Sequence, residues 1–202
     1  MINKNFWNNV AQELLVWEKF NSDFREEIRL GEEWFKDSNL NVFDNLIVKN
    51  ISKRKNQTAL ISVNCNGESQ SLSYEELGLE IKNFSKKLNS EIKSITVFGP
   101  PSLSTALLML TATCQDIKFN INFPSLSEES IITRINLFQP THIAITSENI
   151  NKFSNIVDDL ILKFSIDKEY FIFEVSKKLK IRYKKKSSNI QEIFTMFTSG
   201  ST

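Results

Sequence analysis

The hydroxyl-rich stretch at the end of the sequence contains the residue types best suited to chemistry. Residues 198–202 read Thr-Ser-Gly-Ser-Thr and directly follow the apolar run 193–197. A glycine between small hydroxyl residues lets the backbone turn tightly with its N–H groups pointing one way. Such a concavity, with hydroxyl donors beside it, suits an anion such as a phosphate group. The candidate phosphate-binding residues are Thr198, Ser199, Gly200, Ser201 and Thr202.

The sequence limits what other chemistry is expected. The Gly-Lys-Ser/Thr ending of a Walker loop is absent from the hydroxyl-rich stretch, and a flexible polar tail or a cloning remnant would also explain these residues. His142 is the only histidine, and Cys65 and Cys114 stand far apart. Neither a zinc site nor a Cys-His couple is therefore expected, and no residue is assigned to a metal.

Periodic apolar residues predict the elements that must position this loop. Spacings of three and four predict helical pieces within 4–30 and helices over 42–52, 73–88, 102–110, 127–138 and 149–164. Short β-branched or apolar runs predict strands at 58–63, 70–72, 94–98, 119–123, 141–146, 170–175 and 193–197. Ser73 and Glu76 have the spacing of a capping box, and Ser102 and Ser127 are expected to cap later helices.

The alternation of strands and helices from residue 58 onward predicts an α/β fold. Its sheet is expected to be mostly parallel, with helices on both faces. Residues 1–57 are expected to form a helical arm rich in aromatic residues, including Trp7, Trp17 and Trp34. Ligands of such sheets bind at the carboxyl ends of the strands. The hydroxyl-rich loop follows a predicted strand and therefore stands where a phosphate site is expected.

The composition excludes several classes of protein. The chain has 202 residues, 41% of them hydrophobic, and a net charge of +1, so it can bury a core but lacks the basic excess of a nucleic-acid-binding protein. No apolar stretch is long enough to span a membrane. The N-terminus does not resemble a signal peptide. We therefore expect a cytoplasmic protein with reduced thiols and no membrane or nucleic-acid partner.

Several segments in register resemble AMP-forming acyl-CoA synthetases, and acetyl-CoA synthetases in particular. The end of the chain resembles the start of the family's phosphate-binding motif, whose Gly-x-Pro-Lys continuation would come later. Trp34-Phe35 followed by Leu40-Asn41-Val42 is similar to a segment near the start of acetyl-CoA synthetases. Further similar segments are Ala59-Leu60-Ile61, Leu72-Ser73-Tyr74-Glu75-Glu76-Leu77, the Ser127 helix with Arg134-Ile135, and Pro140 with the strand after it.

The resemblance implies a fold, an activity and site residues. Residues 1–57 would be the family's N-terminal arm, and 58–202 the first half of its adenylating domain, ending within the phosphate loop. The family joins a small carboxylate to ATP, with Mg²⁺, to form an acyl-adenylate, and then transfers the acyl group to coenzyme A. The residues at positions 198–202 would hold the ATP phosphates. Lys152 would lie near the 3′-phosphate of coenzyme A, although an ordinary solvated lysine is the alternative. Arg134 would be structural.

The sequence also departs from the family. Glu91-Ile92-Lys93 replaces a Gly-Asp turn, and Phe123-Pro124-Ser125-Leu126 replaces a glycine-rich turn that allows close backbone approach to coenzyme A. The adenine pocket and the catalytic lysine would lie beyond Thr202, so no catalytic residue is expected within the chain. The chain alone is expected to be inactive, and its 193–197 strand to lie at an open apolar edge.

Two other functions remain open from the sequence. One is a non-catalytic binding or interaction module derived from such an enzyme. The other is an adenylating enzyme that transfers its acyl group to an acceptor other than coenzyme A. The acyl group and the oligomeric state are left open too.

Overall fold

The computed structural model describes residues 4–21, 35, 37–88, 91–154, 160–166, 169–175 and 193–197. Helices, with η for non-α turns, are α1 (Lys4–Leu14), η1 (Asp44–Val48), α2 (Lys49–Arg54), α3 (Tyr74–Lys87), α4 (Leu103–Cys114), α5 (Glu128–Phe138), η2 (Ser147–Asn149) and α6 (Ile150–Ser154). Strands are β1 (Thr58–Val63), β2 (Ser69–Ser73), β3 (Ser94–Phe98), β4 (Lys118–Asn122), β5 (His142–Thr146), β6 (Leu160–Ile166) and β7 (Tyr170–Val175).

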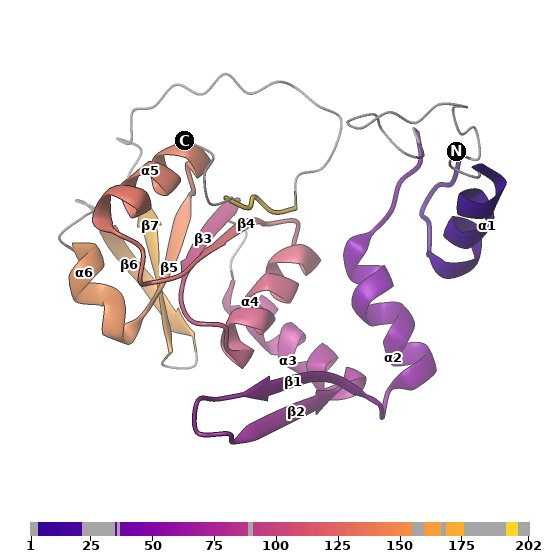
Figure 1. The fold of residues 1–202 in the computed structure, drawn as a ribbon, viewed down its shortest axis with the longest axis horizontal. Coiled ribbons are helices and arrows are strands. Elements are labelled where there is room, and N and C mark those ends of the chain that lie inside the picture. Colours follow the sequence, from indigo (N-terminus) through magenta and orange to yellow (C-terminus); the bar gives the residue numbers. More distant parts are fainter. Residues whose placement is uncertain are drawn as a thin grey trace.

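The main sheet has the strand order β4-β3-β5-β7-β6 (Figure 1). Strands β3, β4 and β5 are parallel. Strand β7 runs antiparallel to β5, and β6 antiparallel to β7. The predicted α/β class is therefore confirmed, and the sheet is mixed, with a parallel half that carries β3, β4 and β5.

Alternating side chains of the sheet bury two separate cores. In β3, Ile95 and Val97 pack with residues of α3 and α4. Phe98 points to the opposite face, where it joins residues of α5 and α6, and its ring centroid lies 4.5 Å from that of Phe153. The period of two along each strand produces this division. Helices cover both faces of the sheet, as predicted.

The predicted helix starts are confirmed at α3, α4 and α5. The Ser73 hydroxyl accepts from the Glu76 N–H at 3.2 Å, and the Glu76 carboxylate accepts from the Ser73 N–H at 2.7 Å. Ser102 and Ser127 cap α4 and α5 in the same way, through their hydroxyl oxygens. These local hydrogen bonds satisfy N–H groups that the first helical turn leaves without partners.

The prediction of one helix over 149–164 is wrong. The helix α6 ends at Ser154, and β6 begins at Leu160 and pairs with β7. Apolar residues in this region have the helical spacing of three and four. The region also includes the consecutive run Leu160-Ile161-Leu162, which fits a strand equally well. Backbone hydrogen bonds to β7 favour the strand over the helix in residues 160–166. No pattern within 149–164 reveals that partner.

The described part of the N-terminal arm contains α1, η1 and α2, joined by non-helical residues in which Lys19 forms a bridge with Asn39. Trp17 donates its indole N–H to the Ala11 carbonyl at 2.9 Å, and its ring contacts Phe20 and Phe35. Helix α2 lies against α3, where a side chain added at Gly78 would come within 2.6 Å of Ile51. The arm thus packs closely onto the body, and a boundary at residue 57 stays a prediction.

Among the described residues no helix is long and apolar enough to cross a membrane.

Candidate functional site

The segment 193–197 lies along the outer edge of β4 (Figure 1). Phe194 forms a parallel bridge with Phe119. The Phe119 N–H donates to the Ile193 carbonyl at 3.1 Å, and the Thr195 N–H donates to the Phe119 carbonyl at 3.0 Å. Because the pairing is parallel, Phe197 reaches the edge of the sheet at which β3, β4 and β5 end.

The hydroxyl-rich loop therefore begins at the carboxyl edge of the parallel strands. That is the edge where α/β sheets bind their ligands. Thr198, Ser199, Gly200, Ser201 and Thr202 themselves lie outside the described residues. Their role as phosphate ligands stays a prediction, and the structure describes the chain only up to the residue that precedes them.

The segment 193–197 lies at an exposed edge of the sheet, as the sequence predicts, but it pairs by one bridge and not as a full strand. Phe194 and Met196 are 58% and 72% exposed. The segment joins β4 by an isolated bridge, with the Phe194 ring stacked on Phe119 at 5.9 Å between centroids. Side chains alternate between the two faces of the segment, so Phe194 and Met196 share an exposed face and residues 193, 195 and 197 are half-buried.

A buried polar network joins β3, β4 and this segment. Thr96 donates its hydroxyl proton to the Asn120 side-chain carbonyl at 3.0 Å, and the Asn122 amide donates to the Thr96 hydroxyl at 3.2 Å. The Asn120 amide donates to the Thr195 carbonyl at 2.6 Å. The side chains of Thr96, Asn120 and Asn122 are all buried. Buried amides that find partners in this way fix their neighbours, since leaving them unpaired is costly.

Arg134 of α5 extends the network to the start of the loop. Its Nη1 donates to the Asn122 side-chain carbonyl at 3.0 Å, and its guanidinium lies 4.9 Å from the Phe197 ring centroid. A guanidinium over an aromatic ring is attracted by the partial negative charge on the face of the ring. The sequence had indicated Arg134 as structural but missed Asn120 and Asn122, whose only signal was two amides alternating within a strand expected to be buried.

A second cluster fixes the chain where β3 ends. A side chain at Gly99 would come within 1.8 Å of the Tyr170 hydroxyl oxygen, so this position has no room for one. The Tyr170 and Thr105 hydroxyls lie 2.6 Å apart, and Thr105 donates to the Pro100 carbonyl at 2.7 Å. The cluster thereby orients the Gly-Pro-Pro turn at the same carboxyl edge of the sheet.

Tyr170 gives a prediction about stability at high pH. Burial raises the pKa of its phenol above the usual value of about 10. Below about pH 10 the phenol is neutral in both states, whereas above it the unfolded chain loses the proton first. The free energy of unfolding should therefore fall as the pH rises from about 10 through the raised pKa. Denaturant unfolding between about pH 8 and 11 measures this slope.

The Tyr170→Phe variant should show a shallower decline in stability over that range. It also loses the hydrogen bond to Thr105, which costs about 1 kcal/mol at every pH. Tyr74→Phe serves as the matched control. If wild type and Tyr170→Phe lose stability with the same slope, the proposed contribution of the buried phenol is wrong.

Lys152 lies against the loop that follows β4. Its ammonium donates to the Pro124 carbonyl at 2.8 Å and to the Leu126 carbonyl at 2.6 Å. Two of the three ammonium protons thus hold the turn that follows β4. Lys152 is partly buried and engaged, so its geometry differs from that of a freely solvated lysine.

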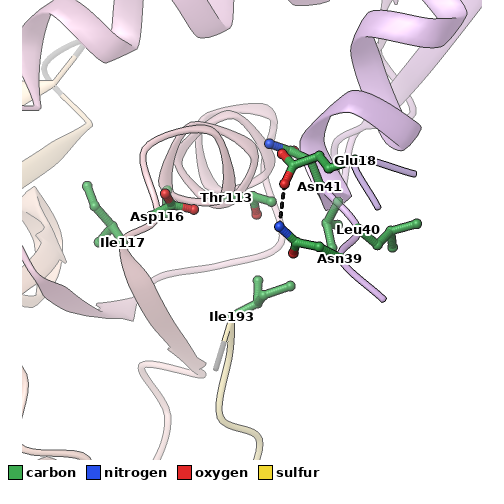
Figure 2. A pocket seen from close by; sticks show the side chains of 10 residues that line it. Glu18, Asn39, Leu40, Asn41, Thr113, Asp116, Ile117 and Ile193 are labelled. Atoms are coloured by element: carbon green, nitrogen blue, oxygen red, sulfur yellow. Dashed lines mark hydrogen bonds between the residues drawn. The ribbon is translucent and has the colours of Figure 1, made fainter. Parts of the chain in front are cut away.

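A polar cavity of about 240 Å³ lies at the opposite edge of the sheet (Figure 2). Glu18, Asn39 and Asn41 line it from the arm, and Asp116 and Ile193 face them. Ile117 directly precedes β4, and Ile193 is the first residue of the segment 193–197, which places the cavity at the amino ends of both. The carboxylates of Glu18 and Asp116 would repel a phosphate, so this cavity is a poor candidate for the phosphate site.

Comparisons with known proteins bear out the resemblance. No protein-family model matches the chain. The acetyl-coenzyme A synthetase of Helicobacter acinonychis is 25% identical over 139 residues, covering 66% of this chain and 21% of the relative. The acetyl-coenzyme A synthetase of Desulfatibacillum aliphaticivorans is 29% identical over 139 residues, covering 64% of this chain and 21% of its own length.

A solved structure supports the same fold. The acetoacetyl-CoA synthetase from Streptomyces lividans superposes with a TM-score of 0.60 and 15% identity, over 68% of this chain and 22% of that one. In sequence and in fold, the chain is similar to a part of acyl-CoA synthetases. Within that class, the relatives that match in sequence are acetyl-CoA synthetases. The chain spans about a fifth of the length of the curated relatives it matches.

Proposed function

We propose that this chain is part of an acid–thiol ligase that activates a short-chain carboxylate with ATP. The carboxylate attacks the α-phosphate of Mg-ATP, which forms an acyl-adenylate and releases pyrophosphate. The thiol of coenzyme A then displaces AMP to form a thioester. The observation that carries the proposal is the parallel pairing of 193–197 with β4, because it brings Phe197, the residue directly before the hydroxyl-rich stretch, to the carboxyl edge of the sheet. The similarity to acetyl-CoA synthetases supports it.

The loop residues would act on the leaving group. Hydroxyl and backbone N–H donors from Thr198, Ser199, Gly200, Ser201 and Thr202 would hold the β- and γ-phosphates while negative charge moves onto pyrophosphate. Donors fixed in advance stabilise such charge better than water, which must reorganise. The described residues supply the support for this loop, whereas the groups that bind adenine and the acyl chain would come from the rest of the ligase.

The test uses the protein encoded by the complete reading frame, called the complete protein below. It measures whether this protein exchanges labelled pyrophosphate into ATP when a carboxylate is present. Exchange with acetate or propionate, absent when the carboxylate is omitted, is the expected result. If no small carboxylate supports exchange, a non-catalytic binding module becomes the better description.

Lys152 is proposed to contact coenzyme A with the ammonium proton that its two carbonyl partners leave over. In the complete protein, Lys152→Met should raise the KM for coenzyme A roughly tenfold to a hundredfold, the value of one hydrogen bond to a charged group. The KM for ATP should stay unchanged. Steady-state thioester formation measures both, and Lys86→Met on the exposed face of α3 is the matched control.

Dephospho-coenzyme A separates this role from a purely structural one. If Lys152 binds the 3′-phosphate, the variant should lose affinity for coenzyme A and little for the dephospho form. If Lys152 only holds the turn after β4, both acceptors should be affected equally, and the proposed phosphate contact would be wrong.

A ligase with another acyl acceptor is the second candidate function. The Phe123-Pro124-Ser125-Leu126 turn favours it, because this turn lacks the glycines that allow close backbone approach to coenzyme A. Exchange of pyrophosphate without any consumption of coenzyme A would support this alternative. Formation of acetyl- or propionyl-CoA would rule it out.

A further inference from the structure

We propose that Arg134, acting with Asn122 and Phe197, is a positioning device for the hydroxyl-rich loop. Arg134 lies on α5, far in sequence from the loop, and its guanidinium contacts the residue directly before Thr198. The inference rests on the proposed function for that loop. It adds residues that would set the geometry of the phosphate contact without touching the nucleotide.

The guanidinium makes two contacts with different directions. Its Nη1 donates in a fixed direction to the side-chain carbonyl of Asn122, at 3.0 Å. Its central carbon lies over the Phe197 ring, 4.9 Å from the ring centroid. Because guanidinium is planar and rigid, the hydrogen bond to Asn122 restricts where the group can lie beside the Phe197 ring. A lysine at this position would keep the charge but not the plane.

Asn122 is itself held in place. Its side chain is 2% exposed, and its amide donates to the Thr96 hydroxyl and to the Asn120 side-chain carbonyl. The position of the guanidinium is therefore set by β3 and β4, the most regular part of the sheet. Asn122 therefore fixes Arg134 relative to the two strands, and Arg134 in turn fixes the Phe197 ring.

The segment 193–197 needs such a support. Its described pairing with β4 is an isolated bridge, and two of its side chains, Phe194 and Met196, are mostly exposed. The Asn120 amide holds the Thr195 carbonyl, and Arg134 holds the Phe197 ring two residues later. These two ties lie between the bridge and the loop, so they set where the loop begins. Misplacing a reacting group by about 1 Å can reduce a rate roughly a hundredfold.

The first experiment follows amide hydrogen exchange in the chain and needs no activity. The Arg134→Met variant should exchange the Thr195 N–H, which donates to Phe119, at least about tenfold faster than wild type. The amide of Leu107 in α4 should be unchanged, which shows that the fold is intact. Arg54→Met, an arginine at the end of α2, is the matched control. Unchanged exchange at Thr195 would overturn the inference.

The second experiment measures pyrophosphate exchange with the complete protein. Arg134→Met should lower the kcat of adenylation about tenfold to a hundredfold, with a small change in the KM for ATP. Arg134→Lys should restore little of it. In a Phe197→Leu background the same Arg134→Met change should have almost no further effect, since the contact is already lost. Strictly additive effects would show that Arg134 and Phe197 act independently and would overturn the inference.

The two proposals fail in different ways. If Ser201→Ala and Thr202→Ala leave the adenylation rate unchanged, the phosphate role of the loop is wrong, whatever Arg134 does. If those variants slow adenylation but Arg134→Met does not, the loop role stands and the positioning role of Arg134 is wrong.

Discussion

The 202-residue chain on its own is expected to give no carboxylate-dependent exchange of pyrophosphate into ATP. It spans about a fifth of the acetyl-CoA synthetases that it matches. The described residues hold the segment that leads into the proposed phosphate loop, and the proposed reaction also needs groups that bind adenine and the carboxylate. Without them the reactants are not held in a reactive geometry, which can be worth about 7–11 kcal/mol of the barrier.

Exchange of labelled pyrophosphate, with acetate or propionate and with no carboxylate, is the measurement. The complete protein at equal concentration serves as the positive control. Exchange by the chain above the level without carboxylate, abolished by Ser199→Ala, would contradict the expectation and assign the whole adenylating site to these residues.

Removing hydroxyl groups from the loop of the complete protein is expected to slow adenylation strongly. A fixed donor to developing negative charge is worth about 3–4 kcal/mol, which is roughly a hundred- to a thousandfold in rate. Ser201→Ala and Thr202→Ala should each lower the rate of adenylate formation, by less than this if neighbouring hydroxyls compensate. The expected loss is in kcat, because the charge on the leaving pyrophosphate develops in the transition state.

Single-turnover adenylate formation measures this effect most directly. Ser201→Thr and Thr202→Ser, which keep the hydroxyl groups, are the matched controls and should retain most of the rate. Wild-type rates in both alanine variants would remove the phosphate role from the loop. Equal losses in the alanine and the hydroxyl-keeping variants would point to packing rather than to the donors.

The features that sequence predicts well here are local ones. The capping box of Ser73 and Glu76 and the caps at Ser102 and Ser127 depend on residues three positions apart, and all three are confirmed. The antiparallel pairing of β1 with β2 around Asn66-Gly67, where Gly67 has a positive φ, is a local structure of the same kind. Short-range hydrogen bonds and glycine geometry determine these structures, so the sequence alone carries the information.

The features that sequence misses depend on distant partners. Leu160–Ile166 becomes a strand because β7 pairs with it, although helical spacing was also present. The role of Asn120 and Asn122 depends on Thr96, Arg134 and the segment 193–197, which come from three other parts of the chain. For the candidate site, sequence thus predicted the residue types of the loop but not the side chains that hold its start.

The parallel pairing at the outer edge of β4 also bears on the order in which the molecule assembles during its synthesis. Asn120 and Thr195, which this pairing joins, are 75 residues apart. Their pairing must wait until both segments have left the ribosome. Strands β3, β4 and β5 can pair earlier, because all three are synthesised before residue 193. A nascent chain would therefore have a folded sheet with an exposed β4 edge, and the segment 193–197 would be the last part of this region to pair.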